Sequence, residues 1–148
     1  MHDIKNVAEG LTAKFGTKVR LSEDEKSLIV TSDDIIDVLQ EIKLNTDFTF
    51  LEDLTAVDYP ECFTVVYHLL SLQDGHILRV KANLEKENPR VESAVSLWHS
   101  ADVMERETYD LMGIIFSDHP NLKRVLCPDD FEGHPLRKDF IVEAALRQ

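Results

Sequence analysis

Side chains that could do acid–base or ligand chemistry are concentrated between residues 100 and 140, where His, Asp, Glu, Arg and Lys follow one another closely. Glu105 and Glu107 could be read as a paired general acid and general base. Neighbouring positions on a helix point in different directions, however, so these two carboxyl groups cannot share one proton site. Ion pairing is the better interpretation, because bidentate arginine–carboxylate bonds can hold an extended chain in place. We therefore expect no catalytic residue here.

The histidines of this stretch do not form a metal-ligand motif. His119 and His134 are fifteen residues apart, and each precedes a proline. His99 could approach Asp102, but it precedes the expected helix and would not share that face. A proline biases the preceding residue toward extended backbone, so both rings would project sideways and form hydrogen bonds as structural histidines. We expect no metal site in the chain.

Nucleotide and iron–sulfur sites have no support in the sequence either. No G-x-G-x-x-G follows an expected strand, and no G-x-x-x-x-G-K-[ST] phosphate loop occurs. The two cysteines, Cys62 and Cys127, belong to no C-x-x-C pair, whereas cluster ligation needs four cysteines. We therefore expect the chain to bind no cofactor of its own.

A helix between Ser100 and Gly113 must position the first half of the charged stretch. Small or apolar residues recur there at the spacing of one buried stripe, namely Ala101, Met104, Thr108, Leu111 and Met112. Ser100 is the expected N-cap and Gly113 the expected left-handed C-terminal cap. The charged positions of the helix are predicted to face solvent or a partner: Glu105, Arg106, Glu107 and Asp110.

The segment after this helix, about residues 116–148, shows neither a helical nor an alternating period and is interrupted by prolines. Between residues 129 and 140 it offers few apolar side chains. Their burial cannot offset the backbone entropy of ordering this segment without hydrogen bonds and a partner surface. We expect the segment to be extended and to lie on a partner.

The rest of the pattern predicts one two-layer domain over residues 1–148. Apolar residues at helical spacing predict helices over about 4–15 and 35–42. The predicted strands are 18–21, 28–31, 48–57, 63–72 and 77–84, and Asp74-Gly75 is the turn between the last two. This order indicates an α+β fold, a two-layer sandwich of helices on a mixed or antiparallel sheet. The compact core would span about 1–115, before the extended segment.

Charge and hydropathy limit the kinds of partner. The chain has 28 acidic and 16 basic residues among 148, a formal net charge of −12. An acidic surface argues against nucleic acid as a direct partner. No apolar run approaches the roughly 20 residues of a spanning helix, so we expect no direct membrane insertion.

Two ordered motifs resemble the signatures of a known family. The first comprises Glu105-Arg106-Glu107, Asp110-Leu111-Met112, His119, Lys123 and Val125-Leu126; the second is Glu132-Gly133-His134-Pro135-Leu136-Arg137-Lys138-Asp139-Phe140. They resemble the 30 kDa subunit of respiratory complex I, the C subunit of the bacterial enzyme. The resemblance is dense over about residues 92–140. It departs at Val103 and Met112, where the family usually has an aromatic residue and a phenylalanine.

The resemblance implies a non-catalytic structural or assembly subunit in the hydrophilic arm of a proton-translocating NADH–quinone oxidoreductase. Such a protein would pack on the quinone-site 49 kDa-type subunit, while FMN and iron–sulfur clusters lie in partner subunits. It would be peripheral on the cytoplasmic side of the plasma membrane through the complex, and soluble when isolated. The residues implied at the partner interface are Glu105, Arg106, Glu107, Asp110, His119, Arg124, His134, Pro135, Arg137, Lys138 and Asp139.

Two alternatives stay open. One is the equivalent subunit of an energy-converting membrane-bound NiFe hydrogenase, or of a ferredoxin- or F420-dependent relative. The other, from a different class, is a free-standing protein-binding module. Neighbouring genes would separate them, because flavin and NADH-binding motifs indicate an NADH enzyme and nickel-site cysteines indicate a hydrogenase.

Overall fold

The computed structural model describes residues 4–140 and shows an α+β fold, as the sequence predicts. Its α-helices and strands, with two short 3-10 turns, follow in the order α1 (Ile4–Phe15), η1 (Gly16–Lys18), β1 (Val19–Leu21), β2 (Ser27–Val30), η2 (Ser32–Asp34), α2 (Ile35–Asn45), β3 (Phe48–Asp58), β4 (Phe63–Ser71), β5 (Ile77–Leu84), β6 (Arg90–Glu92), α3 (Ala101–Met112) and β7 (Ile115–Ser117).

Five strands form one mixed sheet in the order β1-β2-β5-β4-β3. β2 and β5 run parallel, and the other neighbours are antiparallel. The predicted β4–β5 hairpin is confirmed. Its turn contains Gly75 at φ +77, a left-handed conformation that suits glycine, and the Gly75 N–H donates to the Ser71 carbonyl at 2.8 Å.

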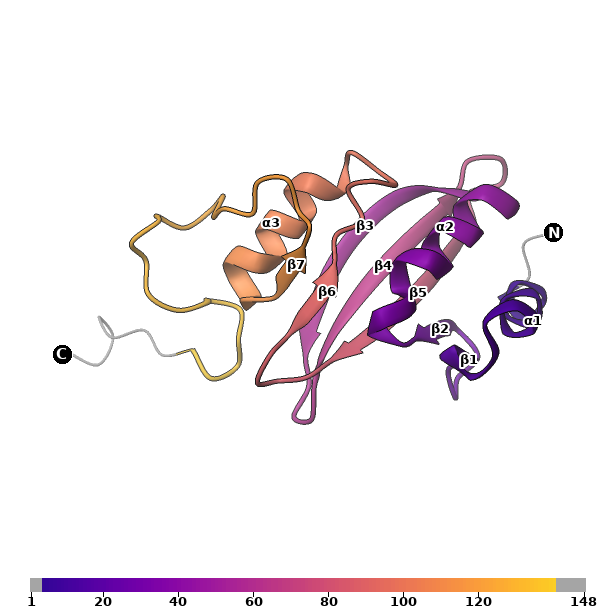
Figure 1. Cartoon of the computed structure of the whole chain (residues 1–148), viewed down its shortest axis with the longest axis horizontal. Helices are drawn as coiled ribbons and strands as arrows, with labels where there is room; N and C mark the ends of the chain where they lie inside the picture. The colour runs from indigo at the N-terminus through magenta and orange to yellow at the C-terminus, as the bar shows by residue number, and fades with distance from the viewer. Residues whose placement is uncertain (1–3, 141–148) are drawn as a thin grey trace.

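One face of the sheet carries the core. Along β5 the side chains alternate between buried Leu78, Val80, Ala82 and Leu84 and more exposed neighbours, the period of a half-buried strand. Figure 1 shows α2 and β6 in front of the sheet, with α1 beside β1 and α3 beside the edge strand β3. The core formed under these elements includes Leu28, Ile35, Leu39, Ile42, Leu51, Val65, Tyr67, Leu69 and Phe116.

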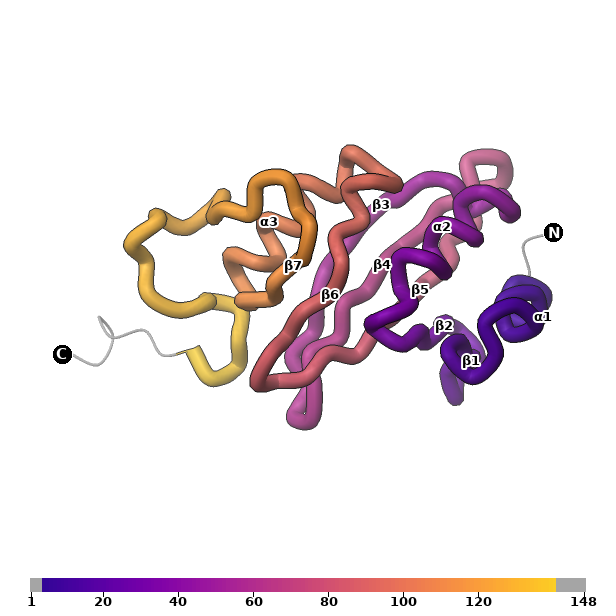
Figure 2. The backbone as a smooth tube through the Cα atoms, in the orientation of Figure 1, coloured from indigo at the N-terminus to yellow at the C-terminus, as the bar shows by residue number. Residues whose placement is uncertain are grey.

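α3 and the chain that follows it form one end of the molecule, opposite α1, as the tube in Figure 2 shows. β6 and β7 pair in parallel there, with Val91 opposite Phe116. Sequence analysis missed this pair, because three-residue strands are too short to show an alternating period. The pair fixes the chain on both sides of α3 to the same place.

The start of α3 differs from the prediction that Ser100 is its N-cap. Ser100 has helical backbone angles, φ −60 and ψ −21, and its side chain makes no capping hydrogen bond. The preceding turn supplies the acceptors instead, because the N–H groups of Ala101 and Asp102 donate to the carbonyls of Trp98 and His99 at 3.1 Å. Backbone hydrogen bonds therefore replace the serine cap.

Candidate partner-binding site

α3 ends at Gly113, and the end of this helix receives the C-terminal segment, residues 118–140. Gly113 has φ +77, and its N–H donates to the Tyr109 carbonyl at 2.8 Å, which confirms the predicted left-handed cap. A Cβ at this position would lie 2.6 Å from Arg137 Nη2 and 2.7 Å from His134 Cδ2. Glycine therefore both ends the helix and leaves room for the segment to cross it.

Three groups of the segment bind the last carbonyls of α3, which receive no hydrogen bond from a following helical turn. His134 Nδ1 lies 2.9 Å from the Asp110 carbonyl, and the Leu136 N–H donates to the Leu111 carbonyl at 2.9 Å. Arg137 Nε donates to the Met112 carbonyl at 2.6 Å. Cations and N–H donors stabilise the C-terminus of a helix. The second sequence motif, residues 132–140, therefore caps α3, the helix that contains the start of the first motif.

Asp110 is completely buried, which contradicts the prediction that it faces solvent or a partner. Its Oδ2 accepts the N–H groups of Val125, Leu126 and Cys127 at 3.1, 2.7 and 2.8 Å. Its Oδ1 lies 3.3 Å from Arg124 Nη1. Burial alone would raise the pKa of Asp110, but these three N–H groups outweigh it and hold the pKa below its ordinary value.

Glu105 is also completely buried, and the prediction that it faces outward is wrong for it too. Its Oε1 accepts the Ser93 hydroxyl at 2.5 Å and its Oε2 the Ala94 N–H at 2.6 Å. Burial raises the pKa of Glu105 above its ordinary value, because two donors offset the desolvation only in part. Glu105 thus joins α3 to the chain just after β6.

His119 has a buried structural side chain at the start of the segment. Its Nε2 lies 3.0 Å from Asp102 Oδ1 and 4.0 Å from Glu105 Oε1. Its Nδ1 accepts the Asn121 N–H at 2.9 Å, which assigns the ring proton to Nε2, and Nε2 donates to the Asp102 backbone carbonyl at 3.2 Å. The predicted hydrogen-bonding role of His119 is confirmed. Its partner was not predicted, because the sequence suggested Asp102 only as a neighbour of His99.

Arginines attach the rest of the segment, mostly through carbonyls and rings. Arg124 Nη2 donates to the Gly133 carbonyl at 2.7 Å, and the guanidinium lies 5.6 Å from the Phe131 ring centre. Arg106 Nε donates to the Lys123 carbonyl at 3.2 Å. Among the described residues, the expected arginine–carboxylate pairing occurs at Arg124 and Asp110.

The segment also reaches the end of the large sheet. The Lys138 N–H donates to Asp58 Oδ2 at 2.9 Å, and the Arg137 guanidinium lies 5.0 Å above the Phe63 ring. Lys86 forms a hydrogen-bonded ion pair with Asp58, and this ion pair, followed by the Lys138 N–H, keeps the pKa of Asp58 low. Asp58, Phe63 and Lys86 were not predicted, because nothing local marks residues that lie 28 to 80 positions from their partners.

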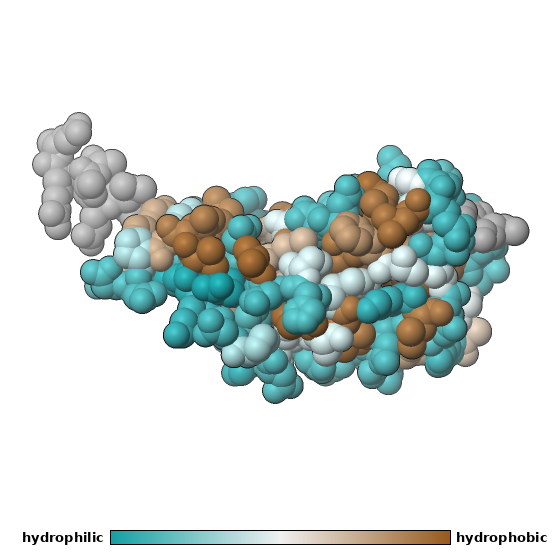
Figure 3. All heavy atoms as spheres, turned by 90° about the horizontal axis from the view of Figure 1, so that it is seen from above, coloured by the Kyte–Doolittle hydropathy of each residue, from teal (hydrophilic) through white to brown (hydrophobic). Residues whose placement is uncertain are grey.

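The outer side of this assembly is apolar and exposed. The exposed fractions of Leu126 and Leu136 are both 61%, and Val103, Val125 and Phe131 are also exposed. Seen from above, one of several hydrophobic patches lies at the end that carries α3 and the segment (Figure 3). We call this set of five exposed apolar side chains the docking surface.

The predicted interface residues are divided between this outer side and the interior. The exposed ones are Glu107, Lys138 and Asp139, and the partly exposed ones are Arg106, Arg124, His134, Pro135 and Arg137. The side chains of Glu105, Asp110 and His119 are buried, so they cannot contact a partner directly.

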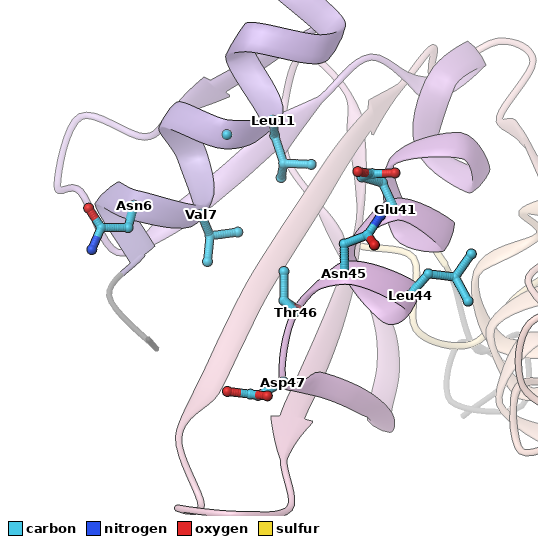
Figure 4. A pocket seen from close by; sticks show the side chains of 9 residues that line it. Asn6, Val7, Leu11, Glu41, Leu44, Asn45, Thr46 and Asp47 are labelled. Atoms are coloured by element: carbon cyan, nitrogen blue, oxygen red, sulfur yellow. The ribbon is translucent and has the colours of Figure 1, made fainter.

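A separate hollow of about 590 Å³ lies between α1 and α2 (Figure 4). It is lined by Asn6, Val7, Gly10, Leu11, Glu41, Leu44, Asn45, Thr46 and Asp47. Lys14 Nζ lies 2.7 Å from Glu41 Oε2, so that carboxylate is already paired. The lining contains neither a thiol nor an imidazole that could act as a nucleophile or base.

Residues 4–140 contain no group of three or more His, Cys, Asp or Glu side chains placed to hold a metal ion. Within the same range, no helix combines the length and the apolar character needed to cross a membrane.

Comparison with known proteins identifies the family that carries the two interlocked motifs. The family described as "Respiratory-chain NADH dehydrogenase, 30 Kd subunit" matches residues 28–145, which include α3 and the segment capping it. The chain belongs to this family. The resemblance inferred from the two motifs is thereby confirmed, and the match extends it back to β2.

The relatives share one name. The C subunit of the NADH-quinone oxidoreductase of Moorella thermoacetica is 52% identical over 125 residues, covering 83% of this chain and 84% of that protein. The protein of the same name from Citrifermentans bemidjiense is 44% identical over 127 residues, covering 84% and 79%. These relatives are subunits of an oxidoreductase.

Solved structures agree with the fold. A trypsin-resistant fragment of Nqo5 is 33% identical, with a TM-score of 0.64, and the match covers 81% of this chain and 99% of the fragment. A chain of the membrane-bound sulfane sulfur reductase, an archaeal respiratory membrane complex, gives a TM-score of 0.80 at 24% identity, covering 96% and 88%. The second likeness shows the fold alone.

Proposed function

We propose that this protein is a non-catalytic assembly subunit in the hydrophilic arm of a proton-translocating NADH–quinone oxidoreductase. The observation that carries the proposal is the docking surface. Buried bonds hold its backbone to α3, while large apolar side chains such as Leu126 and Leu136 remain in solvent. Exposed apolar side chains that cluster on one surface mark a site of protein association.

The partner we propose is the 49 kDa-type quinone-site subunit, with FMN and the iron–sulfur clusters held by other subunits. In this arrangement the chain is peripheral to the cytoplasmic side of the plasma membrane. The relatives named as the C subunit support the oxidoreductase as the assembly. The free-standing module is disfavoured by the same similarity, because those relatives are named as subunits.

The non-catalytic role is supported by how the acidic and histidine side chains of the two motifs are used. Asp110, Glu105 and His119 each bind groups of their own chain, and none of these side chains is open to solvent. A general acid or base must reach its substrate within hydrogen-bonding distance. We therefore assign these residues to holding the docking surface in shape.

The test is assembly with the large subunit after charge is placed on the docking surface. Leu126→Asp and Leu136→Asp each put a carboxylate where the proposal buries an apolar side chain, and should reduce recovery of the large subunit in a pull-down at least tenfold. Leu44→Asp is the matched control, because Leu44 is 67% exposed but belongs to α2. Equal recovery with all three variants would contradict the proposal.

A further inference from the structure

The large sheet has a second face that no helix of residues 4–140 covers. Cross-strand pairing places its side chains in rows. One row joins Phe50 of β3, Leu70 of β4 and Ile77 of β5, and the next joins His68 of β4 and Arg79 of β5. Residues directly opposite in a sheet lie on the same side, about 4.5–5.5 Å apart at Cβ. We call this side the open face.

The first row of the open face is apolar and exposed. Phe50 is 43% exposed and Ile77 53%, with Leu70 between them partly exposed. Leu72, in the turn that follows β4, is also exposed, at 68%. Three large apolar side chains, Phe50, Leu70 and Ile77, therefore adjoin one another in solvent, at a distance from the docking surface on α3.

Beside this row the open face is cationic, although the whole chain carries −12. Arg79 and Lys81 follow Ile77 on the same side of β5, and Arg20 of β1 reaches this side through its pairing with Ile29. Arg79 Nε donates to His68 Nε2 at 3.0 Å, and His68 Nδ1 lies 3.9 Å from Asp53 Oδ2. Among the strand positions on this side, Arg20, Arg79 and Lys81 are cationic and Asp53 is acidic. Asp24, in the turn between β1 and β2, is a second acidic group and interacts with Lys81.

We propose that the open face is a second docking surface, which binds an acidic segment of a neighbouring subunit. Apolar side chains of that segment would cover Phe50, Leu70 and Ile77, and its carboxylates would meet Arg79 and Lys81. A second copy of this chain fits poorly, because two such faces would bring cations against cations. The inference rests on the proposed function, since it requires the chain to be part of an assembly.

Photo-cross-linking in cells that make the whole complex tests this surface. Benzoylphenylalanine is introduced in turn at Ile77 on the open face, at Leu136 on the first docking surface, and at Leu44 on α2. We expect one cross-linked band from position 77 and one from position 136, with at least tenfold less product from position 44. Mass spectrometry of the position 77 product should identify a peptide of another subunit with several Asp or Glu residues.

The three positions separate failure of this inference from failure of the proposed function. A band from position 136 with none from position 77 would overturn the open face as an interface and leave the proposed function standing. Absence of bands at both positions would overturn both. A product of position 77 that contains two copies of this chain, or a peptide without carboxylates, would overturn the acidic partner.

Charge reversal provides the second measurement. Lys81→Glu should lower the position 77 cross-link at least fivefold, and raising the salt concentration should lower it in the wild type, because the attraction is screened. Glu9→Lys is the control, because it changes the charge by the same amount in the opposite direction at an exposed position of α1. It should leave the cross-link unchanged. Melting temperatures of both variants verify folding. An unchanged cross-link in folded Lys81→Glu would overturn the charge complementarity.

Discussion

Two buried carboxylates in one helix, Glu105 and Asp110, have pKa values displaced in opposite directions. Burial opposes the charge of both, but Asp110 receives three backbone N–H groups and adjoins Arg124, whereas Glu105 receives two donors. The balance of desolvation against donors therefore decides the sign in each case. Both side chains act as internal anchors of the docking surface, and each role has a measurable consequence for stability.

Asp110→Asn should lower the free energy of unfolding of the isolated chain by about 3–5 kcal/mol, the usual cost of breaking a buried ion pair. The amide would leave Arg124 unpaired and would not match three N–H donors. Urea unfolding measures the change. Asp130→Asn, at an exposed position of the same segment, is the control and should stay within about 0.5 kcal/mol of the wild type. A small loss with Asp110→Asn would refute its anchoring role.

The titration of both carboxyl groups, Glu105 and Asp110, should affect how stability depends on pH. Because the folded-state pKa of Glu105 lies above its ordinary 4.5, Glu105 contributes stability below that value, which is lost as the pH rises through the folded pKa. The lowered pKa of Asp110 does the opposite, so its contribution is present above its ordinary 3.8 and is lost as the pH falls through the folded pKa.

We therefore expect the free energy of unfolding to rise as the pH is lowered through the folded-state pKa of Glu105 toward 4.5, and to fall below about 3.8. Glu105→Gln, which mimics the protonated acid, should remove the rise and keep the fall. Chemical unfolding at each pH measures both limbs. A rise that is unchanged in Glu105→Gln would show that another group causes it.

The features of single residues could be predicted where residues close in sequence determine them. Gly113 could be identified as a cap, because a left-handed residue at a helix end favours glycine. The structural role of His119 followed from the proline beside it. The burial of Glu105 and Asp110 could not be foreseen, because their partners lie 11 to 17 residues away and charged helix positions are usually solvated.

The C-terminal segment shows how an element without regular structure can be attached to its own chain. The sequence predicts that hydrogen bonds and a partner surface are both necessary, because few apolar side chains are available. The structure shows hydrogen bonds of this kind, from His134, Leu136 and Arg137 to the end of α3. The acceptors of these hydrogen bonds, the unpaired carbonyls at the helix C-terminus, were not predicted.

Gly113→Ala tests this attachment. The new Cβ would meet Arg137 Nη2 and His134 Cδ2 below 3 Å, in addition to the cost of about 1–3 kcal/mol for a left-handed alanine. Gly16→Ala is a matched control, because Gly16 has φ +66 and nothing lies within 4 Å of its Cβ position. Only Gly113→Ala should speed hydrogen exchange at the Leu136 amide. Equal exchange in both variants would contradict the attachment.

The motif that contains Arg137 implies a role for this residue at the partner interface. Its contacts within the chain predict that it also stabilises the fold. Arg137→Ala removes a charged hydrogen bond to the Met112 carbonyl and a guanidinium over the Phe63 ring. The isolated chain should lose about 1.5–3 kcal/mol of unfolding free energy, measured by thermal melting. Lys123→Ala, at an exposed position, should change it little. An unchanged melting temperature would assign Arg137 to the interface alone.

The architecture of the whole molecule was largely predictable, because its strands and helices carry strong periods and a clear Asp-Gly turn. The predicted β4–β5 hairpin and the α+β class agree with the structure, and the strands predicted over 18–21 and 28–31 occur as the antiparallel pair β1 and β2. The parallel contact of β2 with β5 and the β6–β7 pair were not specified, since pairing between distant strands leaves no local pattern. Those two pairings place α3 at one end of the molecule and leave the open face uncovered.

The proposed binding of the large quinone-site subunit to the docking surface on α3 and the C-terminal segment can be tested at individual side chains. Hydroxyl-radical footprinting of the purified chain, with and without that subunit, measures the exposure of individual side chains. We expect oxidation of Leu126, Phe131 and Leu136 to fall at least fivefold on binding, while oxidation of Leu44 stays constant. Binding of the large subunit with undiminished oxidation of Leu126, Phe131 and Leu136 would contradict the proposed role of the docking surface.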